Sequence, residues 1–330
     1  MSGEVIFFIK LMKRSNLPLL CDPVTREDLI LTDAVYDGDE IVSGMLVSPS
    51  NRYPIKNGIP RFVNDEGYSD NFGYQWNRWA RVQFEDRNVG RPMQGHTEQM
   101  FRKSTGFTKG KLRGRTVLDM GCGPGRFSDV ASTMGARVVA LDYSSAIDVA
   151  KDNFKGKDSD ILFVQGDCLR MPFKDGSIDY AFTIGVLHHT PSPAAGVQEA
   201  HRVVKVGGEF AIRVYRAGGF YDRPSVRFWR NIFQGLKPIF GHYPPLVYSY
   251  LFGSLIYFLG RIWKPLGYLL RPVIPTVWSP DYQWSILDTF DAVATTHQSG
   301  HTTQEIESWL QESGFTEWRQ IMPNNYIAQR

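Results

Sequence analysis

Five short apolar runs alternate with helical stretches between Arg115 and Tyr215, and this alternation constrains the fold more than any other feature. The runs are "TVLDM", "ARVVALD", "DILFVQGD", "SIDYAFTIG" and "GGEFAIRVY". Helices are expected between them at Arg126–Met134, Ser145–Phe154 and Ala194–Val204. Apolar strands joined by helices form parallel sheets with helices on both faces. The sequence therefore predicts an α/β core.

A glycine-rich loop follows the first run, in the segment "VLDMGCGPGRFS" from Val117 to Ser128. Its glycines, Gly121, Gly123 and Gly125, are spaced two apart, whereas a dinucleotide fingerprint reads Gly-x-Gly-x-x-Gly. No Lys-Ser or Lys-Thr pair follows the last glycine, which excludes a Walker phosphate loop. The backbone must still approach a ligand closely, because a Cβ atom would occupy the ligand's space.

Aspartates stand at the ends of the first three expected strands, where α/β sheets bind their ligands. Asp119 precedes the loop and would repel a pyrophosphate, but it would attract a cationic ligand such as S-adenosylmethionine (SAM). Asp142 ends the second strand, at the usual place for a carboxylate that accepts both ribose hydroxyls. Asp167 is expected to accept from the adenine amino group, beside the backbone N–H of Cys168. These residues predict SAM binding.

Four segments together carry a family resemblance: "VLDMGCGPGRFS", "GDCLRMPFKDGSIDY", "GVLHHTPSP" and "RVVKVGGEF". In this order they resemble the class I SAM-dependent methyltransferases, of the small-molecule type that includes quinone-biosynthesis enzymes. The resemblance is close over residues 116–215 and looser from residue 302 onward. It implies SAM as cofactor and a Rossmann-like, seven-stranded, mostly parallel sheet whose last strand is antiparallel. It also places Tyr143 and Ile184 near SAM.

Residues 1–65 form a small β-rich head that resembles the zinc-ribbon-like head found before some of these enzymes. Of the four thiolates expected there, Cys21 remains, while Val24, Ser48 and Asn51 occupy the other positions. One thiolate cannot make a tetrahedral zinc site, so the head is predicted to hold no metal. Its small core is expected to consist of Tyr53, Ile55, Ile59 and Phe62.

Residues 66–114 are expected to be linker and lid helices ahead of the core at residues 115–215. The segment "FGYQWNRW" resembles one that headed methyltransferases carry before the glycine loop. It is expected to act as a lid, with Tyr74 and Gln75 near the cofactor. Equally compatible with the sequence is an aromatic seam that packs the head against the core.

Residues 216–296 are predicted to form a mainly helical insertion that closes the acceptor site. Its apolar run between Pro245 and Arg261 is shorter than the ~20 residues that a spanning helix needs. Residues 216–280 contain eight basic residues and one acid. Contact with an anionic amphiphile or a membrane surface is therefore the alternative to a lid. Residues 297–330 are expected to return to the core as a helix and two strands.

Catalytic candidates are the histidines that the pattern places near the methyl group. His188 and His189 follow the fourth expected strand, and His297 precedes the last helix. Their pKa lies near the operating pH, so any of them could act as a base for a hydroxyl or an acidic carbon. A thioether acceptor needs no base, so an O-, C- or S-acceptor stays open. Asp288 and Asp291 are further polar candidates.

Composition narrows the remaining function classes. The net charge of +3 gives no support for nucleic-acid binding, and three cysteines fit a reducing compartment. Because no secretory signal is recognised, a cytoplasmic enzyme is expected, with peripheral membrane contact as the alternative. The expected acceptor is an apolar or amphiphilic small molecule, or a lipid- or glycan-linked intermediate. The alternative of an RNA or protein methyltransferase is disfavoured, because this chain lacks the Asn/Asp-Pro-Pro-Tyr/Phe motif after the fourth expected strand. A non-catalytic SAM-binding scaffold is the third alternative.

Overall fold

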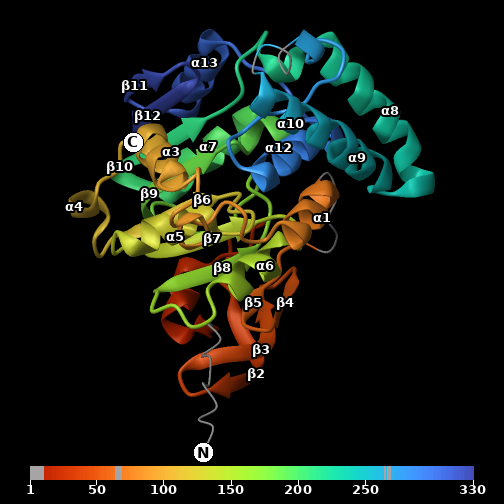
Figure 1. The fold of residues 1–330 in the computed structure, drawn as a ribbon. Coiled ribbons are helices and arrows are strands. Elements are labelled where there is room, and N and C mark those ends of the chain that lie inside the picture. The colour runs from red at the N-terminus through yellow and green to blue at the C-terminus, as the bar shows by residue number, and fades with distance from the viewer. Residues whose placement is uncertain (1–10, 64–68, 264, 266–268) are drawn as a thin grey trace, which may run out of the picture.

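The computed structural model describes residues 11–63, 69–263, 265 and 269–330, and at its centre lies a seven-stranded mixed sheet (Figure 1). The strand order is β11-β12-β10-β9-β6-β7-β8, in which β12 is antiparallel to both its neighbours and the pairs from β10 to β8 are parallel. The strands span Thr116–Met120 (β6), Arg137–Asp142 (β7), Ile161–Gln165 (β8), Ile178–Ile184 (β9), Val204–Arg213 (β10), Glu317–Met322 (β11) and Asn325–Gln329 (β12). The predicted Rossmann-like α/β core is confirmed.

The two faces of this sheet are buried by different elements, because successive strand side chains point to opposite faces. Val117 packs with helices α3, α5 and α6, whereas its neighbour Leu118 packs with α7, α13 and the head. These helices span His96–Thr105 (α3), Arg126–Thr133 (α5), Ala146–Asn153 (α6), Pro193–Val203 (α7) and Thr303–Ser313 (α13). Short helices at Glu85–Asn88 (α2) and Lys109–Leu112 (α4) complete the segment before the core.

The last helix has the end signals that the sequence carries. Thr302 is the N-cap of α13, and it forms a capping box with Glu305. Gly314 ends the helix in the left-handed conformation, with φ +94°. Both ends of this helix are therefore determined locally by its sequence.

The head is a five-stranded antiparallel sheet that packs on the edge of the main sheet. Its strands are Met12–Lys13 (β1), Ile30–Asp37 (β2), Glu40–Val47 (β3), Arg52–Lys56 (β4) and Ile59–Pro60 (β5), and a 3₁₀ helix spans Arg14–Leu19. The N–H of Phe62 donates to the carbonyl of Gln165 at the end of β8 (2.8 Å). The head thus covers an edge strand that would otherwise be open to pairing.

Asp22 organises the part of the head where the resemblance would place zinc ligands. Ser48 and Asn51 both donate to its Oδ2 (2.5 and 2.9 Å), and Tyr53 and the N–H of Val24 donate to its Oδ1 (3.0 and 2.7 Å). Within the described ranges no group of three metal-ligating side chains occurs. A metal-free head stays a prediction, now with a hydrogen-bonded carboxylate as its organising group.

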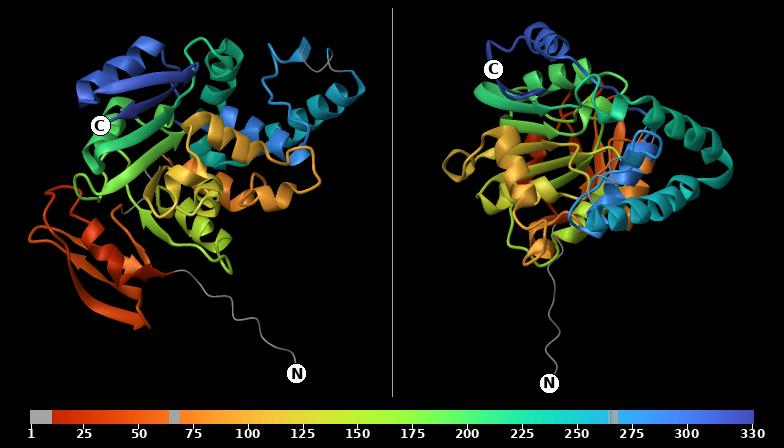
Figure 2. Two further views of the ribbon diagram at one scale, coloured as in Figure 1. Left: turned by 90° about the vertical axis from the view of Figure 1, so that its left-hand side faces the viewer. Right: turned by 45° about the horizontal axis from the view of Figure 1, so that its top comes forward.

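The insertion lies at the opposite end of the molecule from the head, with the sheet between them (Figures 1 and 2). It contains α8 (Pro224–Phe240), α9 (Tyr243–Tyr248), a π-helical segment Ser249–Gly253, α10 (Ser254–Ile262) and α12 (Tyr282–Ala294). The run Tyr243–Ile262 is one helix of 20 residues, long and apolar enough by length and composition to cross a membrane. The apolar run between Pro245 and Arg261 is shorter than this helix because it leaves out Tyr243 and Pro244, which lie in the first helical turn, where proline is tolerated.

Three sets of sequence-based expectations lie outside the described residues. Residues 1–10 carry the expectation about a secretory signal, residues 64–65 end the predicted head, and Lys264 is one of the eight basic residues counted in the insertion.

Candidate active site

The glycine loop joins β6 to α5 at the carboxyl edge of the sheet, with all three glycines at positive φ (+85°, +53° and +91°). Gly121 and Gly123 line a cavity of about 290 Å³. Gly125 does not, since a Cβ atom there would meet the Phe154 ring at 3.1 Å and not the cavity. Its predicted contact with the cofactor is therefore corrected: Gly125 allows α5 and α6 to pack closely.

Asp142 lies at the end of β7 and lines the same cavity. Its Oδ2 accepts from the N–H of Gly123 (2.8 Å), and its Oδ1 accepts from the N–H and the hydroxyl of Ser144 (2.9 and 2.7 Å). A carboxylate offers about four lone-pair sites, so these bonds hold the group in place and leave it capacity toward the cavity. Tyr143, Cys168 and Ile184 also line the cavity, and their contact with the cofactor stays a prediction.

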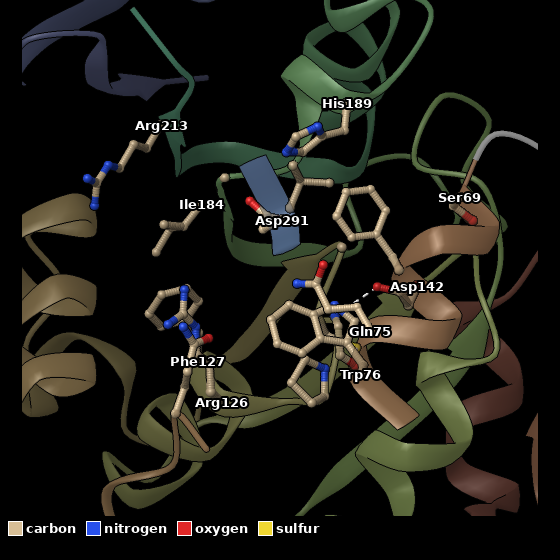
Figure 3. A pocket seen from close by; sticks show the side chains of 18 of the residues that line it. Ser69, Gln75, Trp76, Arg126, Phe127, Asp142, Ile184, His189, Arg213 and Asp291 are labelled. Atoms are coloured by element: carbon tan, nitrogen blue, oxygen red, sulfur yellow. Dashed lines mark hydrogen bonds between the residues drawn. The ribbon is translucent and has the colours of Figure 1, made fainter. Parts of the chain in front are cut away.

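Helix α1 (Asp70–Arg78) forms the wall next to Asp142 (Figure 3). Gln75 and Trp76 line the cavity, and both polar atoms of the buried Gln75 amide lack a hydrogen-bond partner in the structure. Tyr74 points away, with its ring stacked on His242 at 4.6 Å, so its predicted contact with the cofactor is wrong. The helix serves both as a cavity wall and as an aromatic seam, and among the residues that the structure describes this seam packs against the insertion.

Two of the predicted aspartates, Asp119 and Asp167, do not line the cavity. Asp119 is 2% exposed, and its Oδ2 accepts from the hydroxyl of Ser128 in α5 (2.7 Å). Burial raises the pKa of Asp119 to about 7 despite this hydrogen bond. Asp167 accepts from the N–H of Leu169 (2.9 Å), and its neighbours in sequence line the cavity in its place. Asp119 lies in β6, where adjacent residues point to opposite faces of the sheet, and the position of an aspartate in a strand does not show which face it takes.

A polar cluster occupies the side of the cavity next to the insertion. Asp288 and Asp291 come from α12, and Tyr215 donates to Asp291 Oδ2 (3.4 Å). Burial, with Asp291 nearby, raises the pKa of Asp288 to about 7, and burial lowers that of Arg126 to about 10. The further polar lining residues are Gln83, Arg213 and Tyr221. This polar cluster is set in a cavity whose lining is otherwise mostly apolar.

A family model matches the part of the chain that contains the glycine loop and Asp142. Residues 118–212 match the model described as a methyltransferase domain. The chain carries a SAM-dependent methyltransferase domain. Its cofactor is S-adenosyl-L-methionine. The orphaned Gln75 amide, the strand-end Asp142 and the close-approach glycines fit a nucleoside with polar groups.

Curated relatives of this methyltransferase domain include three with differing roles. A demethylmenaquinone methyltransferase of Beutenbergia cavernae is 37% identical over 35% of this chain and 47% of its own length. The sterol 24-C-methyltransferase of Gibberella zeae is 34% identical over 34% of this chain and 31% of its own length. An uncharacterised chloroplast methyltransferase of Arabidopsis thaliana is 32% identical over 42% and 40%. The chain thus spans less than half the length of these relatives.

Among solved structures, a SAM-dependent methyltransferase from Aquifex aeolicus is similar to this chain. It is 22% identical, with a TM-score of 0.32, over 36% of this chain and 64% of that chain.

The three candidate histidines of the methyltransferase domain have different environments. His189 lines the cavity, and its Nδ1 lies 2.9 Å from the carbonyl oxygen of His297. His297 contributes this backbone atom, while its side chain is exposed and does not line the cavity. His188 is fully buried, stacks on Tyr215 at 3.6 Å and accepts from its N–H (3.2 Å). The catalytic predictions for His188 and for the His297 side chain are therefore corrected, because neither ring reaches the cavity.

Proposed function

We propose that this chain transfers the methyl group of SAM to a hydroxyl or an acidic carbon at the polar end of a small amphiphilic molecule. The observation that carries the proposal is that His189, Asp288 and Asp291 line the same cavity as the glycine loop and Asp142. One cavity thus offers a cofactor wall and a polar acceptor wall. Bound SAM supplies an electrophilic methyl group, and the chain's residues have to bind, orient and deprotonate the acceptor.

His189 is the proposed base. Its Nδ1–H donates to the carbonyl of His297, which leaves Nε2 as the unprotonated nitrogen of a neutral ring. Burial lowers the pKa of His189, so the ring is neutral at pH 7. A neutral imidazole that lines the cavity can accept the proton of a hydroxyl or an acidic carbon.

The proposed acceptor-binding groups are Asp288, Asp291 and the two tyrosines of the polar cluster. Carboxylates and phenols in a buried wall suit an acceptor whose reacting end carries several hydrogen-bond donors. The same cavity is bounded by Phe72, Trp284 and Leu287, which suit an apolar body. Relatives named for demethylmenaquinone and for sterols support a small-molecule acceptor over RNA or protein.

Labelled methyl transfer tests this proposal. Purified protein with methyl-labelled SAM is incubated with organic-soluble and aqueous fractions of cell extract, and label is expected in the organic-soluble fraction. The variant His189→Gln should lose turnover by about 100-fold, the usual contribution of a general base, while SAM affinity measured by calorimetry stays unchanged. His242→Gln, outside the cavity, is the matched control.

The pH dependence separates a base from a merely structural histidine. Because burial depresses the pKa of His189, protonation sets in below the ordinary value of about 6.5. Turnover is therefore expected to fall as the pH drops below that value, which is a lower pH than the titration of Asp288 at about 7. A rate that is insensitive to pH, or label that enters protein or RNA alone, would contradict the proposal.

A further inference from the structure

The helical run Tyr243–Ile262 packs one side against the protein. Leu246, Ile256 and Tyr257 are buried, and Gly253 lies so close to α12 that an added Cβ atom would be 3.0 Å from Ile286. Tyr248 donates to the carbonyl of Pro275 (3.1 Å). In the apolar part of this run, 44% is buried against the rest of the protein, so the helix packs as an integral part of the insertion.

The outer side of the same run is also apolar. Exposed side chains recur every three or four residues and form one stripe along the helix. We call this stripe the outer apolar face: Tyr243, Val247, Tyr250, Leu251, Leu255, Phe258 and Ile262. A surface helix of a water-soluble protein normally presents polar residues outward. Here Leu251 is 61% exposed and Ile262 is 82% exposed, so an apolar surface of this kind needs a partner.

More apolar surface continues from both ends of the outer apolar face. Ile239 and Phe240, at the end of α8, are exposed just before the run begins. Trp263 is exposed just after it ends. Figure 2 shows α8 and the run as two long helices at the rim of the insertion, away from the sheet.

The charges beside this face are positive. Arg261 is exposed one residue before Ile262, and its guanidinium donates to the Tyr257 hydroxyl (3.1 Å). Arg78 reaches over from α1, where it donates to the Tyr250 hydroxyl (3.4 Å) and lies over its ring. Within residues 216–280 the sequence has eight basic residues against one acid. Positive charges around an apolar stripe complement an anionic lipid surface and would repel a second copy of the same face.

We propose that the run Tyr243–Ile262 lies flat on an anionic membrane surface, with its outer apolar face in the boundary between headgroups and acyl chains. Arg78 and Arg261 would extend toward the headgroups, as long basic side chains do at such boundaries. Crossing the bilayer would require the run to leave α12, against which its inner side is packed. This inference concerns binding to a surface and stands independently of the proposed methyl acceptor.

The docked surface is adjacent to the catalytic cavity. Helix α12 lies between the two, since one of its sides contacts the run through Ile286 and another lines the cavity through Leu287 and Asp288. Docking would therefore hold the cavity two helices away from the bilayer, where amphiphilic molecules are concentrated.

Vesicle flotation of the full chain tests the proposal. The probes are vesicles of phosphatidylcholine alone and vesicles that also contain phosphatidylglycerol, each at low and at high salt. The chain is expected to float with the anionic vesicles at low salt, and less at high salt because the charge attraction is screened. The double variant Leu255→Glu/Phe258→Glu should reduce the bound fraction about tenfold or more, since two buried apolar contacts are lost.

The control is Val206→Glu, which places the same charge at an apolar side chain that is 86% exposed on β10, outside the insertion. It should float like the unchanged chain. If the double variant loses its SAM binding or its helical circular dichroism, the single variant Leu251→Gln replaces it.

Three results would overturn the proposal. The first is no flotation with anionic vesicles at low salt. The second is membrane association that survives high salt and alkaline extraction, which indicates a spanning helix. The third is a lipid-free dimer in light scattering that the double variant converts to a monomer, which assigns the outer apolar face to a second copy of the chain.

Discussion

Asp142 joins the glycine loop to the end of β7, because its carboxylate accepts from the N–H of Gly123 as well as from Ser144. Replacing it removes a charged acceptor from the cavity wall and releases the loop. Asp142→Ala is expected to weaken SAM binding by about 2 kcal/mol, measured by isothermal titration calorimetry. Asp152→Ala, on the exposed side of α6, should leave the affinity unchanged. Equal affinities for the two variants would refute the assignment.

Gly123 is the loop glycine that brings the backbone closest to the α1 wall. Its φ is +53°, and a Cβ atom would lie 2.9 Å from the indole nitrogen of Trp76. Gly123→Ala should cost about 1–2 kcal/mol of stability through backbone strain and should weaken SAM binding by displacing Trp76. Gly110→Ala adds the same methyl group where nothing lies within 4 Å, and serves as control in thermal melts and calorimetry. Identical behaviour of both variants would show that the loop tolerates side chains.

At the scale of whole elements, the sequence predicted the core strands well because they are continuous apolar runs that end in a glycine or an aspartate. The ends of α13 were predictable for a similar reason, since Thr302 and Gly314 act within one turn of chain. The environment of Asp119 could not be predicted from the sequence, because the side of a strand that faces the ligand depends on how the sheet packs. The acceptor wall was missed in part for the same reason. Arg126 and Asp288 are far apart in sequence, and tertiary packing alone brings them together.

The hydrogen-bonded cluster around Asp22 makes the stability of the head depend on pH. Burial alone would raise the pKa of Asp22, but the hydrogen bonds from Ser48, Asn51 and the N–H of Val24 outweigh it and hold this pKa well below its usual range. A depressed carboxyl pKa stabilises the fold above the unfolded value of about 3.9, and the contribution is lost as the pH falls below it.

Asp22→Asn is therefore expected to lower the free energy of unfolding by about 2 kcal/mol at pH 7 and by less near pH 3. Thermal melts at both pH values measure this difference. Asp28→Asn, at a carboxylate whose side chain is 81% exposed, is the control. One zinc ion per chain in elemental analysis of the purified protein would instead contradict the metal-free head, and with it the role assigned to Asp22.

At the scale of the whole molecule, the head and the catalytic core share one apolar cluster. Met12 and Ile41 of the head belong to the same buried set as Leu118 and Leu141 of the sheet. Arg61 reinforces the contact, because its guanidinium donates to both carboxylate oxygens of Asp148 in α6 (2.8 and 2.6 Å). A head attached by a linker alone would be free to unfold separately, whereas a shared cluster couples the two parts.

Calorimetry is therefore expected to record a single unfolding transition for head and core, with equal calorimetric and van't Hoff enthalpies. Arg61→Ala should lower the Tm of that transition by about 2 °C, since the pair is partly exposed and contributes about 1 kcal/mol. Arg91→Ala removes an exposed arginine elsewhere and should leave the Tm unchanged. Two separate peaks in the unchanged chain would mean that the head is an independent unit, because a cluster common to both parts cannot melt in two steps.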